Sequence, residues 1–371
     1  MRIGIDARFY SSHFTGIGRY VFELIKNLAQ IDKKNEYVIF LNEPQFSEFE
    51  LPNHRFKKVL ADAHHYSISE QWGFWRKLEK EKLDLMHFTH FNAPLLYRKR
   101  SVVTIHDLTL SLFPGAKMTS FIHRVAYHLI INSIAKRAKS VIAVSQNTKK
   151  DIEKFLKTPK EKIHTIYEAA GEEFRLITDH TARQKFLQKY ELTRPYLLYT
   201  GVWRSHKNLP NLLRSFALLR NRYDLDIDLV MTGRPDPHYP EVIDTIQDNQ
   251  LSPYVRMPGL VPEEDLIMFY NCAASFVMPS LYEGFGLPLL EAFACGAPVC
   301  SSNASCLPEV AGEGNAIFFD PHNPEDMAEK IADLLRSPEK QAELRARGLK
   351  RTHDFSWDKM AHETLKIYTN H

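Results

Sequence analysis

Residues 274–301 read ASFVMPSLYEGFGLPLLEAFACGAPVCS, and this stretch contains one complete unit of the predicted fold. The apolar run 274–278 predicts a strand. Pro288 suits the first turn of a helix and Gly296 suits the residue after its end, so 288–295 is predicted to be a short helix. The apolar run 298–301 predicts the next strand. This order of elements is typical of a parallel sheet.

The same alternation of apolar runs and helical patterns continues outward along the chain. Further strands are predicted at 2–5, 37–41, 85–88, 102–105, 141–144, 163–166, 196–200, 228–232, 255–257 and 316–319. Helices are predicted at 18–30, 71–81, 121–138, 149–155, 208–223, 240–250, 262–271, 324–336, 339–352 and 356–368. We therefore expect an α/β protein with two Rossmann-like, doubly wound parallel-sheet domains that face a cleft between the carboxyl ends of their sheets.

Length and composition agree with two globular domains. The chain has 371 residues, of which 44% are hydrophobic and 25% charged. The stretch 171–182 lacks an apolar run, so we place the boundary there and predict domains at 1–175 and 176–355. The final helical pattern, 356–371, is expected to pack back on the first domain.

The sequence also indicates the compartment in which the protein works. It has no apolar run of about 18 residues and no secretory leader, and its four cysteines form no CxxC pair. We therefore expect a cytoplasmic protein with buried free thiols.

Charge is distributed unevenly between the two halves. Residues 1–175 hold 28 lysines and arginines against 19 aspartates and glutamates, whereas the remainder holds 20 against 26. The helical pattern 121–139 combines apolar residues with the basic Arg124, Lys136, Arg137 and Lys139. This pattern indicates either peripheral contact with an anionic membrane, at its inner face, or core packing with solvated charges.

Two carboxylates flank the turn in the opening stretch. Glu283 is predicted on a loop and Glu291 about one turn into the helix. Between them, the amides of Gly286 and Leu287 are expected at a helix amino end, which favours anions. Carboxylates that accept hydroxyl groups beside an anion site suit a ligand with phosphates and hydroxyls, such as a nucleotide sugar.

Two further loops carry phosphate chemistry. Arg204 and Lys207 follow the strand 196–200, where cations would neutralise a departing diphosphate. Gly16 and Gly18 precede the first helix, where a backbone can approach a phosphate closely. The dinucleotide fingerprint is incomplete because Val21 replaces its third small residue, so a nicotinamide cofactor is not expected.

Histidines supply the remaining candidates. His106 follows the strand 102–105 and is placed to contact a sugar or steer a proton, unless it is a structural histidine. His90 and Asn92 lie after another strand and are weak candidates for acceptor contacts. No histidine pair has the HExxH spacing of a zinc site, and no metal is expected.

Together these motifs resemble glycosyltransferase family 4, which comprises retaining, nucleotide-sugar-dependent enzymes of the GT-B fold. The resemblance runs nearly from end to end, and the segment with two glutamates is its most specific part. It rests on GIGRY at 16–20, VTIHDL at 103–108, VS at 144–145, TGV at 200–202, HKN at 206–208, PSLYEGFGLPLLEA at 279–292 and PEVAG at 308–312.

The resemblance implies a role for each matched residue. His106, Lys207 and Glu283 would be the catalytic residues, with His106 beside the transferred sugar. The donor diphosphate would be bound by Gly16, Gly18, Arg204, Lys207, Gly286 and Leu287. The donor sugar would contact His106, Glu283, Phe285 and Gly286, and Glu291 would hold the ribose. The domain 1–175 would be the acceptor side, and 176–355 would bind the nucleotide sugar.

The resemblance also implies the reaction and its substrates. Such enzymes retain the anomeric configuration without a metal or other cofactor. The chain looks most like bacterial mannosyl- and rhamnosyl-type enzymes of O-antigen and exopolysaccharide assembly. The donor would be a GDP- or UDP-sugar, with GDP-mannose as the first choice. The acceptor would be a lipid-linked glycan or an oligosaccharide. No nucleic acid would be a partner.

Two departures and two other functions stay open. His206 stands where many relatives have arginine, and Glu168-Ala169-Ala170-Gly171 stands near the end of the first domain where many have an Asn-Gly pair. A hydrolysing sugar-nucleotide 2-epimerase would share the two-domain shape and need no acceptor. A non-catalytic partner subunit that binds sugar nucleotides is the other alternative.

Overall fold

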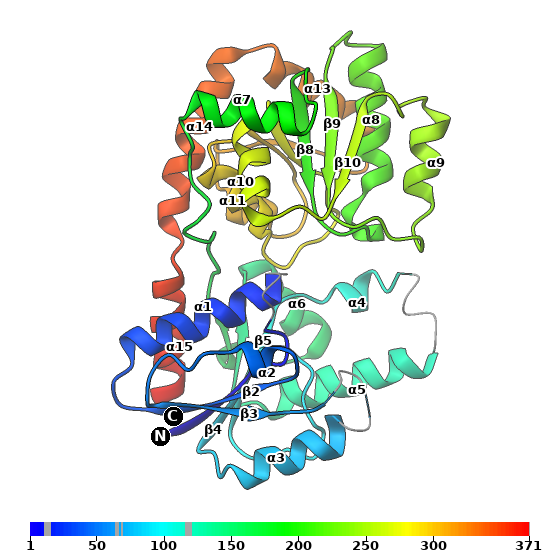
Figure 1. The fold of residues 1–371 in the computed structure, drawn as a ribbon. Helices are drawn as coiled ribbons and strands as arrows, with labels where there is room; N and C mark the ends of the chain where they lie inside the picture. The colour runs from blue at the N-terminus through cyan, green and yellow to red at the C-terminus, as the bar shows by residue number, and fades with distance from the viewer. Residues whose placement is uncertain (11–15, 64–66, 68–69, 116–120, 371) are drawn as a thin grey trace. The chain divides into compact units, whose positions relative to one another are not determined.

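A computed structural model describes residues 1–10, 16–63, 67, 70–115 and 121–370 (Figure 1). The chain divides into two compact units. Unit 1 comprises Met1–Ser111, Met118–Glu168 and Ser356–His371, and unit 2 comprises Leu112–Lys117 and Ala169–Phe355. Apart from the short segment Leu112–Lys117, the division between the units falls after Glu168, a few residues before the predicted boundary, and the C-terminal helix belongs to unit 1.

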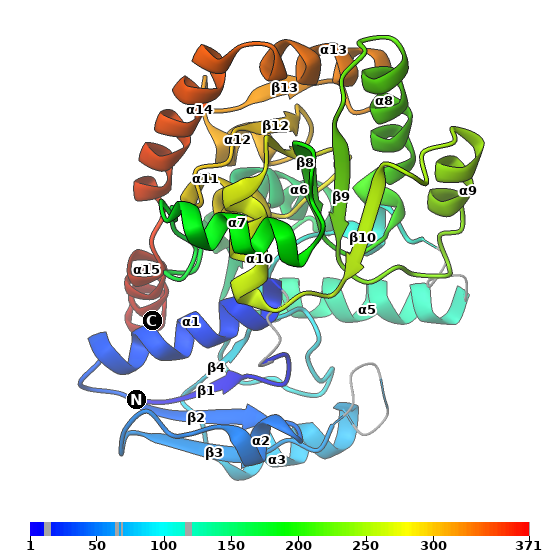
Figure 2. The ribbon, with the colours of Figure 1, turned by 45° about the horizontal axis from the view of Figure 1, so that its top comes forward.

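Unit 1 is built on a parallel sheet, part of which is seen in Figure 2. Its strands are β1 (Arg2–Asp6), β2 (Glu36–Leu41), β3 (Phe56–Leu60), β4 (Leu85–Phe88), β5 (Ser101–Ile105), β6 (Ser140–Ala143) and β7 (Ile163–Thr165). They lie in the order β3-β2-β1-β4-β5-β6-β7. The order reverses between β1 and β4, which makes this the switch point of a doubly wound sheet.

Helices cover both faces of this sheet. They are α1 (Gly16–Ile31), α2 (Gln45–Glu48), η1 (Glu70–Phe74), α3 (Trp75–Lys80), α4 (Thr109–Leu112), α5 (Phe121–Arg137), α6 (Gln146–Leu156), η3 (Lys160–Lys162) and α15 (Trp357–Thr369). Alternate strand residues such as Phe40 and Val103 pack with α3, α5 and α6 in one buried cluster. On the other face, α1 and α15 contact each other.

Unit 2 repeats the same strand order. Its strands are β8 (Tyr196–Thr200), β9 (Asp228–Thr232), β10 (Val255–Gly259), β11 (Ser275–Met278), β12 (Val299–Ser302) and β13 (Ile317–Phe319). They are parallel and lie in the order β10-β9-β8-β11-β12-β13. The switch point is therefore between β8 and β11, and ligands of such sheets bind at the carboxyl ends of the strands there.

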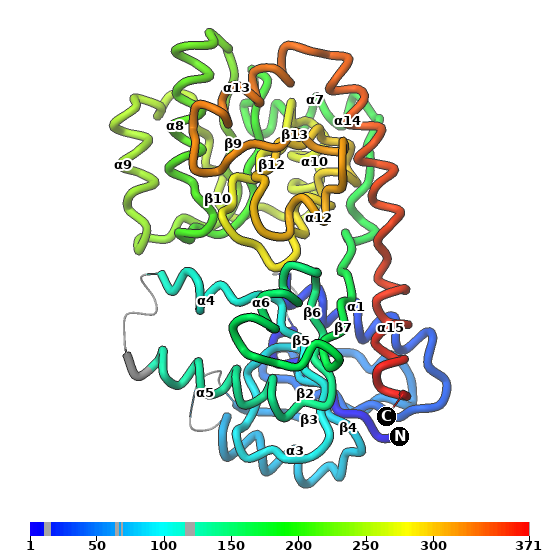
Figure 3. Tube along the Cα trace, turned by 180° about the vertical axis from the view of Figure 1, so that it is seen from behind, coloured from blue at the N-terminus to red at the C-terminus, as the bar shows by residue number. Residues whose placement is uncertain are grey.

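The helices of unit 2 cover its sheet in two layers. They are α7 (His180–Lys189), η4 (Ser205–Lys207), α8 (Leu209–Asn221), α9 (Glu241–Asp248), α10 (Glu263–Cys272), α11 (Leu287–Ala294), α12 (Leu307–Ala311), α13 (Pro324–Leu335), α14 (Pro338–Arg351) and η5 (Thr352–Asp354). Helices α8, α9 and α13 share one buried cluster with the sheet (Figure 3). On the other face, Phe186 of α7 and Phe269 of α10 pack edge to face.

The two parallel sheets confirm the predicted fold class. The sequence patterns missed β3, α2, α4 and α12, which are short, and also the ten-residue helix α7, whose sequence is mostly polar. Strand β3 reads FKKVL and lies at the edge of its sheet, where lysines are common, so its apolar signal is weak. The helix predicted from Pro288 begins one residue earlier, at Leu287, with Gly286 as its N-cap residue.

Candidate active site

The loops after β8 and β11 meet at the switch point of unit 2. The amide of Leu281 donates to the carbonyl of His206 at 2.7 Å and joins the two loops. The loop after β8 forms the short helix η4, which ends at Lys207, and Asn208 then takes a left-handed conformation with φ +59°. This turn lets α8 begin at once, so the position of Lys207 is set by both elements.

Lys207 and Glu283 form a two-pronged ion pair at this edge. The Lys207 Nζ lies 2.7 Å from Oε1 and 2.9 Å from Oε2 of Glu283. Burial alone would raise the pKa of Glu283, but the charges of Lys207 and His206 and the hydrogen bond from Lys207 hold that pKa below its usual range. The site therefore holds an ionised carboxylate beside an ammonium group.

Ser305 and Cys306 hold the backbone on either side of Glu283. The Ser305 hydroxyl donates to the carbonyl of Glu283 at 2.7 Å and accepts from its amide at 3.2 Å. The Cys306 thiol lies 3.2 Å from the carbonyls of both Glu283 and Phe285. The sequence predicted only that Cys306 is a buried free thiol, because nothing in its spacing indicates a contact more than 20 residues away.

The turn before α11 places a helix amino end beside this pair. Gly286 has φ +93°, and a Cβ atom there would lie 2.9 Å from Leu307 Cδ2. The first amides of a helix have no partner inside it, so those near Gly286 and Leu287 favour an anion. The structure thus places the predicted phosphate-binding backbone next to the predicted sugar-binding Glu283, and both roles stay predictions.

Glu291 lies in the next turn of α11 and is fixed from two elements. Its Oε2 accepts the hydroxyl of Tyr270 at 2.9 Å, and that hydroxyl lies 3.0 Å from Thr200 Oγ1 at the end of β8. Burial and the charge of Glu291 raise the pKa of Tyr270, so the phenol keeps its proton. Glu291 is therefore held at the switch point, where a ribose role would require it.

Arg204 has a carboxylate partner that the sequence did not indicate. Its NH1 lies 2.5 Å from Oδ2 of Asp236 and 2.7 Å from the carbonyl of Trp203. Asp236 also faces His238, at 2.7 Å from its Nδ1. The predicted second cation for the diphosphate is thus engaged by the loop after β9.

In unit 1, His106 is buried after β5 with a partner on each ring nitrogen. Its Nδ1 lies 3.0 Å from Glu168 Oε1, and its Nε2 lies 3.0 Å from the carbonyl of Thr89. Burial would lower the pKa of His106, but Glu168, the Thr89 carbonyl and Asp107 raise it on balance. Gly16 and Gly18 begin α1, and Tyr20 of that helix packs edge to face on the imidazole.

His90 and Asn92 lie after β4, beside the switch point of unit 1. The His90 ring packs between Phe9 and Phe91, with centroids 4.6 and 4.0 Å away. Asn92 is fully buried, and neither amide atom of its side chain has a hydrogen-bond partner among the described residues. That unmet capacity suits a polar ligand group, and the predicted acceptor contact stays a prediction.

A buried ion-pair network next to Asn92 was also missed. Arg8 binds Asp6 and Glu70, each at 2.7 Å, and donates to the carbonyl of Asn92 at 3.0 Å. Burial would lower the pKa of Arg8, but both carboxylates raise it. Arg8 therefore fixes the loop after β1 to the loop after β4.

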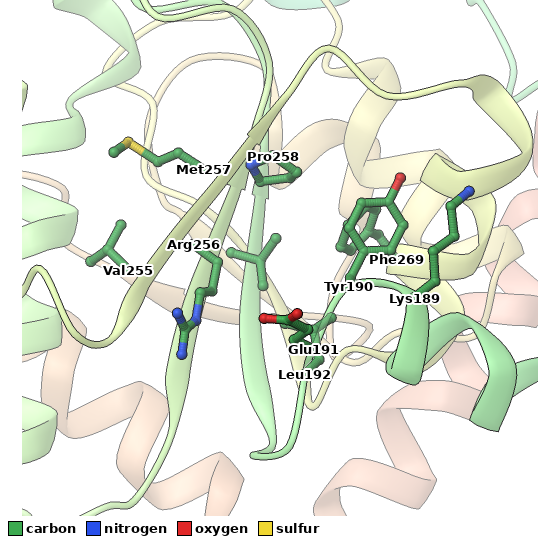
Figure 4. Close-up of a pocket in the computed structure, with 10 residues that line it drawn as sticks. Lys189, Tyr190, Glu191, Leu192, Val255, Arg256, Met257, Pro258 and Phe269 are labelled. Carbon is green, nitrogen blue, oxygen red and sulfur yellow. The ribbon is translucent and has the colours of Figure 1, made fainter.

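A pocket of about 430 Å³ opens elsewhere in unit 2, beside the edge strand β10 (Figure 4). Lys189, Tyr190, Arg256, Met257 and Phe269 line it. Lys189 and Tyr190 are already engaged with Asp265, at 2.7 and 2.8 Å. None of the predicted site residues lines this pocket, and we locate the candidate active site at the switch point instead.

The described part of the chain lacks both a cluster of metal ligands and a membrane-spanning helix. It has no group of three or more histidines, cysteines, aspartates or glutamates placed to hold a metal ion. Over the same residues, no helix is long and apolar enough to cross a membrane.

Two doubly wound parallel sheets, with a lysine, a carboxylate and a helix amino end at one switch point, define the class of nucleotide-sugar-dependent transferases with the GT-B fold. The chain is a glycosyltransferase that carries two family domains. Residues 14–170 match the family described as Glycosyltransferase Family 4, and residues 182–351 match the one described as Glycosyl transferases group 1.

Individual relatives agree with this assignment. O-antigen chain mannosyltransferase B of Escherichia coli is 29% identical over 95% of this chain and 96% of its own length. The serotype-specific mannosyltransferase WbdA of the same species is 32% identical over 64% of this chain, which corresponds to 30% of that longer protein. Anabaena Alr3699/HepE, solved with UDP and glucose, has a TM-score of 0.79 at 17% identity and is covered completely, as is this chain.

Proposed function

We propose that this enzyme is a retaining glycosyltransferase that moves a hexose, mannose from GDP-mannose in the first instance, to a growing glycan of O-antigen type. The observation that carries the proposal is the Lys207–Glu283 pair beside the amino end of α11. Mannosyl transfer is supported by the names of the relatives, O-antigen chain mannosyltransferase B and WbdA.

Each group of the pair has a distinct task in this proposal. Lys207 and the α11 amides stabilise the negative charge that develops on the departing diphosphate, and Arg204 adds to it. Because that charge is met by protein cations and amides, we propose that no metal is needed. Glu283 accepts hydrogen bonds from hydroxyls of the donor sugar.

Glu283 is not the general acid of a glycosidase couple. A general acid must be protonated near neutral pH, and Lys207 keeps the pKa of Glu283 low. Glu291 is bound to Tyr270 and is proposed to hold the ribose. The two ion-paired or hydrogen-bonded carboxylates support donor binding by both glutamates. We propose that the acceptor attacks the same face of the sugar that the diphosphate leaves.

Donor turnover tests this proposal directly. The purified enzyme is incubated with GDP-mannose, UDP-glucose or UDP-GlcNAc in EDTA, with and without a mannosylated acceptor, and the anomeric configuration is read by NMR. We expect acceptor-dependent release of GDP and an α-linked product from the α-linked donor. Turnover of UDP-GlcNAc without acceptor would favour the 2-epimerase. Tight nucleotide binding without any turnover would favour the non-catalytic partner subunit.

Substitutions at the pair give the sharper result. Lys207→Ala and Glu283→Ala should each lower kcat/KM by about 100-fold or more, because a desolvated electrostatic contact to the transition state is lost. Exposed residues of unit 2 supply matched controls, Lys340→Ala and Glu329→Gln, which should leave activity unchanged. Full activity in either site variant would refute the proposed mechanism.

We further propose that the acceptor is lipid-linked and that unit 1 contacts an anionic membrane. The basic excess of residues 1–175 supports this, as do the exposed Val125 and Leu129 on α5. Sedimentation with phosphatidylglycerol vesicles should exceed that with phosphatidylcholine vesicles and fall with salt. Equal binding to both would exclude an electrostatic contact.

A further inference from the structure

The protonation of His106 is determined by what its two nitrogens face. A backbone carbonyl only accepts hydrogen bonds, so Nε2, at 3.0 Å from the carbonyl of Thr89, must carry a proton. Nδ1 lies 3.0 Å from Glu168, and this contact raises the pKa of His106, which favours a second proton on the ring. The side chains of His106 and Glu168 are 10% and 4% exposed, so water does not readily replace either partner.

We propose that Glu168 is a positioning residue that keeps His106 as an imidazolium, so that the loop after β5 presents a fixed positive charge to an anionic group of the substrate. This inference rests on the proposed function, in which that group belongs to the nucleotide sugar. Both N–H groups are engaged within unit 1, so His106 acts through its charge and ring edge. It is not expected to transfer a proton to the substrate.

The surroundings of the imidazole agree with a buried cation. Tyr20 packs its ring edge to face with the imidazole at 4.9 Å, and it belongs to α1, whose first residues include Gly16 and Gly18. The amino end of a helix favours anions in the same way as an imidazolium does. The first turn of α1 therefore contains both the predicted phosphate-binding Gly16 and Gly18 and, at its end, the Tyr20 that packs on His106.

Other titratable groups around His106 do not compete for its proton. His87 on β4 is fully buried, and burial together with His106 lowers its pKa to about 3, so it stays neutral. Burial raises the pKa of the Tyr20 phenol far above neutrality. Asp107, the next residue in the loop, raises the pKa of His106 further. Glu168 is thus the carboxylate in direct contact, and Asp107 adds to its effect.

Glu168 is also a point at which this chain departs from the pattern it resembles. An uncharged amide side chain at this position would not hold a proton on His106. The proposed effect therefore depends on the carboxylate of Glu168. It predicts a pH dependence that an amide at this position would not produce.

The test uses the full-length enzyme with ¹⁵N-labelled histidine, titrated by NMR from pH 6 to 9.5. His106 is assigned from the spectrum of His106→Gln, and His87 serves as the reference for a neutral ring. We expect the two His106 nitrogens to stay protonated at pH 7.5 in the wild type and in the control Glu161→Gln, whose carboxylate is exposed. In Glu168→Gln, which has nearly the same shape, the pKa of His106 should fall, because the charge that raises it is removed.

Kinetics then separates a positioning role from a structural one. The alkaline limb of kcat/KM for the sugar nucleotide should move to lower pH in Glu168→Gln, and kcat/KM at pH 8 should fall by about tenfold. Glu168→Asp should restore part of the loss. A neutral His106 at pH 7 in the wild type, or an unchanged limb in Glu168→Gln, would overturn the inference. The NMR titration needs no turnover, so failure of the proposed transferase activity would be seen separately.

Discussion

Single residues outside the motif with two glutamates, residues 279–292, determine how Glu283 is held in place. Ser305 takes φ +58°, a left-handed conformation that is uncommon for a residue with a side chain. Its hydroxyl both donates to and accepts from the backbone of Glu283. Such conformations occur at functional sites where the surrounding contacts maintain them. The left-handed conformation of Ser305 is therefore expected to lower the stability of the fold slightly while its hydroxyl holds Glu283 in position.

Two substitutions at this position should separate the two effects. Ser305→Ala and Ser305→Gly both remove the hydroxyl, so both should lower kcat/KM by about tenfold as Glu283 loses its support. Only glycine relieves the positive φ, so Ser305→Ala should be less stable than Ser305→Gly by about 1 kcal/mol in urea unfolding. Ser252→Ala, at an exposed turn, is the control. Wild-type activity in both variants would show that the contact does not position Glu283.

The roles predicted from sequence at this scale depend on local spacing. Lys207 and Glu283 could be predicted as site residues because each lies in a compact motif after a recognisable strand. Ser305, Asp236 and Glu168 were missed because each contacts the site across a loop from another βα unit. Residue types as common as these carry no signal until the strand order places their loops side by side.

Helix α11 presents its amino end only because Gly286 allows a sharp entry. The residue has φ +93°, and a Cβ would lie 2.9 Å from Leu307 Cδ2, a packed side chain of α12. An L-residue with a side chain rarely adopts that φ, so the turn and the neighbouring helix both oppose a substitution. The positions of the Gly286 and Leu287 amides thus depend on the absence of one methyl group.

We expect Gly286→Ala to lower the thermal midpoint and to weaken GDP binding. The strain and close contact should cost about 1 to 3 kcal/mol, and displaced amides should raise the Kd for GDP by about tenfold. Gly73→Ala is the matched control, because a Cβ there meets none of the described residues within 4 Å. Calorimetry gives both quantities. Unchanged GDP affinity in Gly286→Ala would exclude these amides from the diphosphate site.

The more completely a strand or helix is buried, the more clearly its sequence pattern predicted it. Strands such as β4, with every residue buried, gave mainly apolar runs that matched the structure closely. Edge strand β3 and the helices of four or five residues gave no run long enough to recognise. The parallel fold still followed from the sequence, because the buried central strands alternate with helices long enough to show their periodicity.

At the scale of the whole chain, unit 1 is completed only by the last residues. Helix α15 follows the end of unit 2 in sequence, yet it packs against α1 at the start of the chain. Its Tyr368 hydroxyl lies 2.5 Å from His87 Nδ1, and His87 Nε2 lies 2.8 Å from Thr104. This buried network joins α15 to β4 and β5, so the sheet that carries His106 depends on the C-terminal helix.

Deletion of residues 356–371 should therefore destabilise unit 1 selectively. The deletion uncovers the face against which α15 buries Trp357, Met360, Ala361, Thr364, Ile367 and Tyr368. At about 1.5 to 3 kcal/mol for each large apolar side chain, the loss is on the order of 10 kcal/mol, comparable to the whole stability of a domain.

Hydrogen exchange should increase across β1, β4 and β5, while β8 and β11 stay protected and GDP still binds. Deletion of residues 370–371 alone is the control. Equal loss of protection in both units would show that they unfold together, and unchanged protection of β1 would show that α15 is dispensable to unit 1.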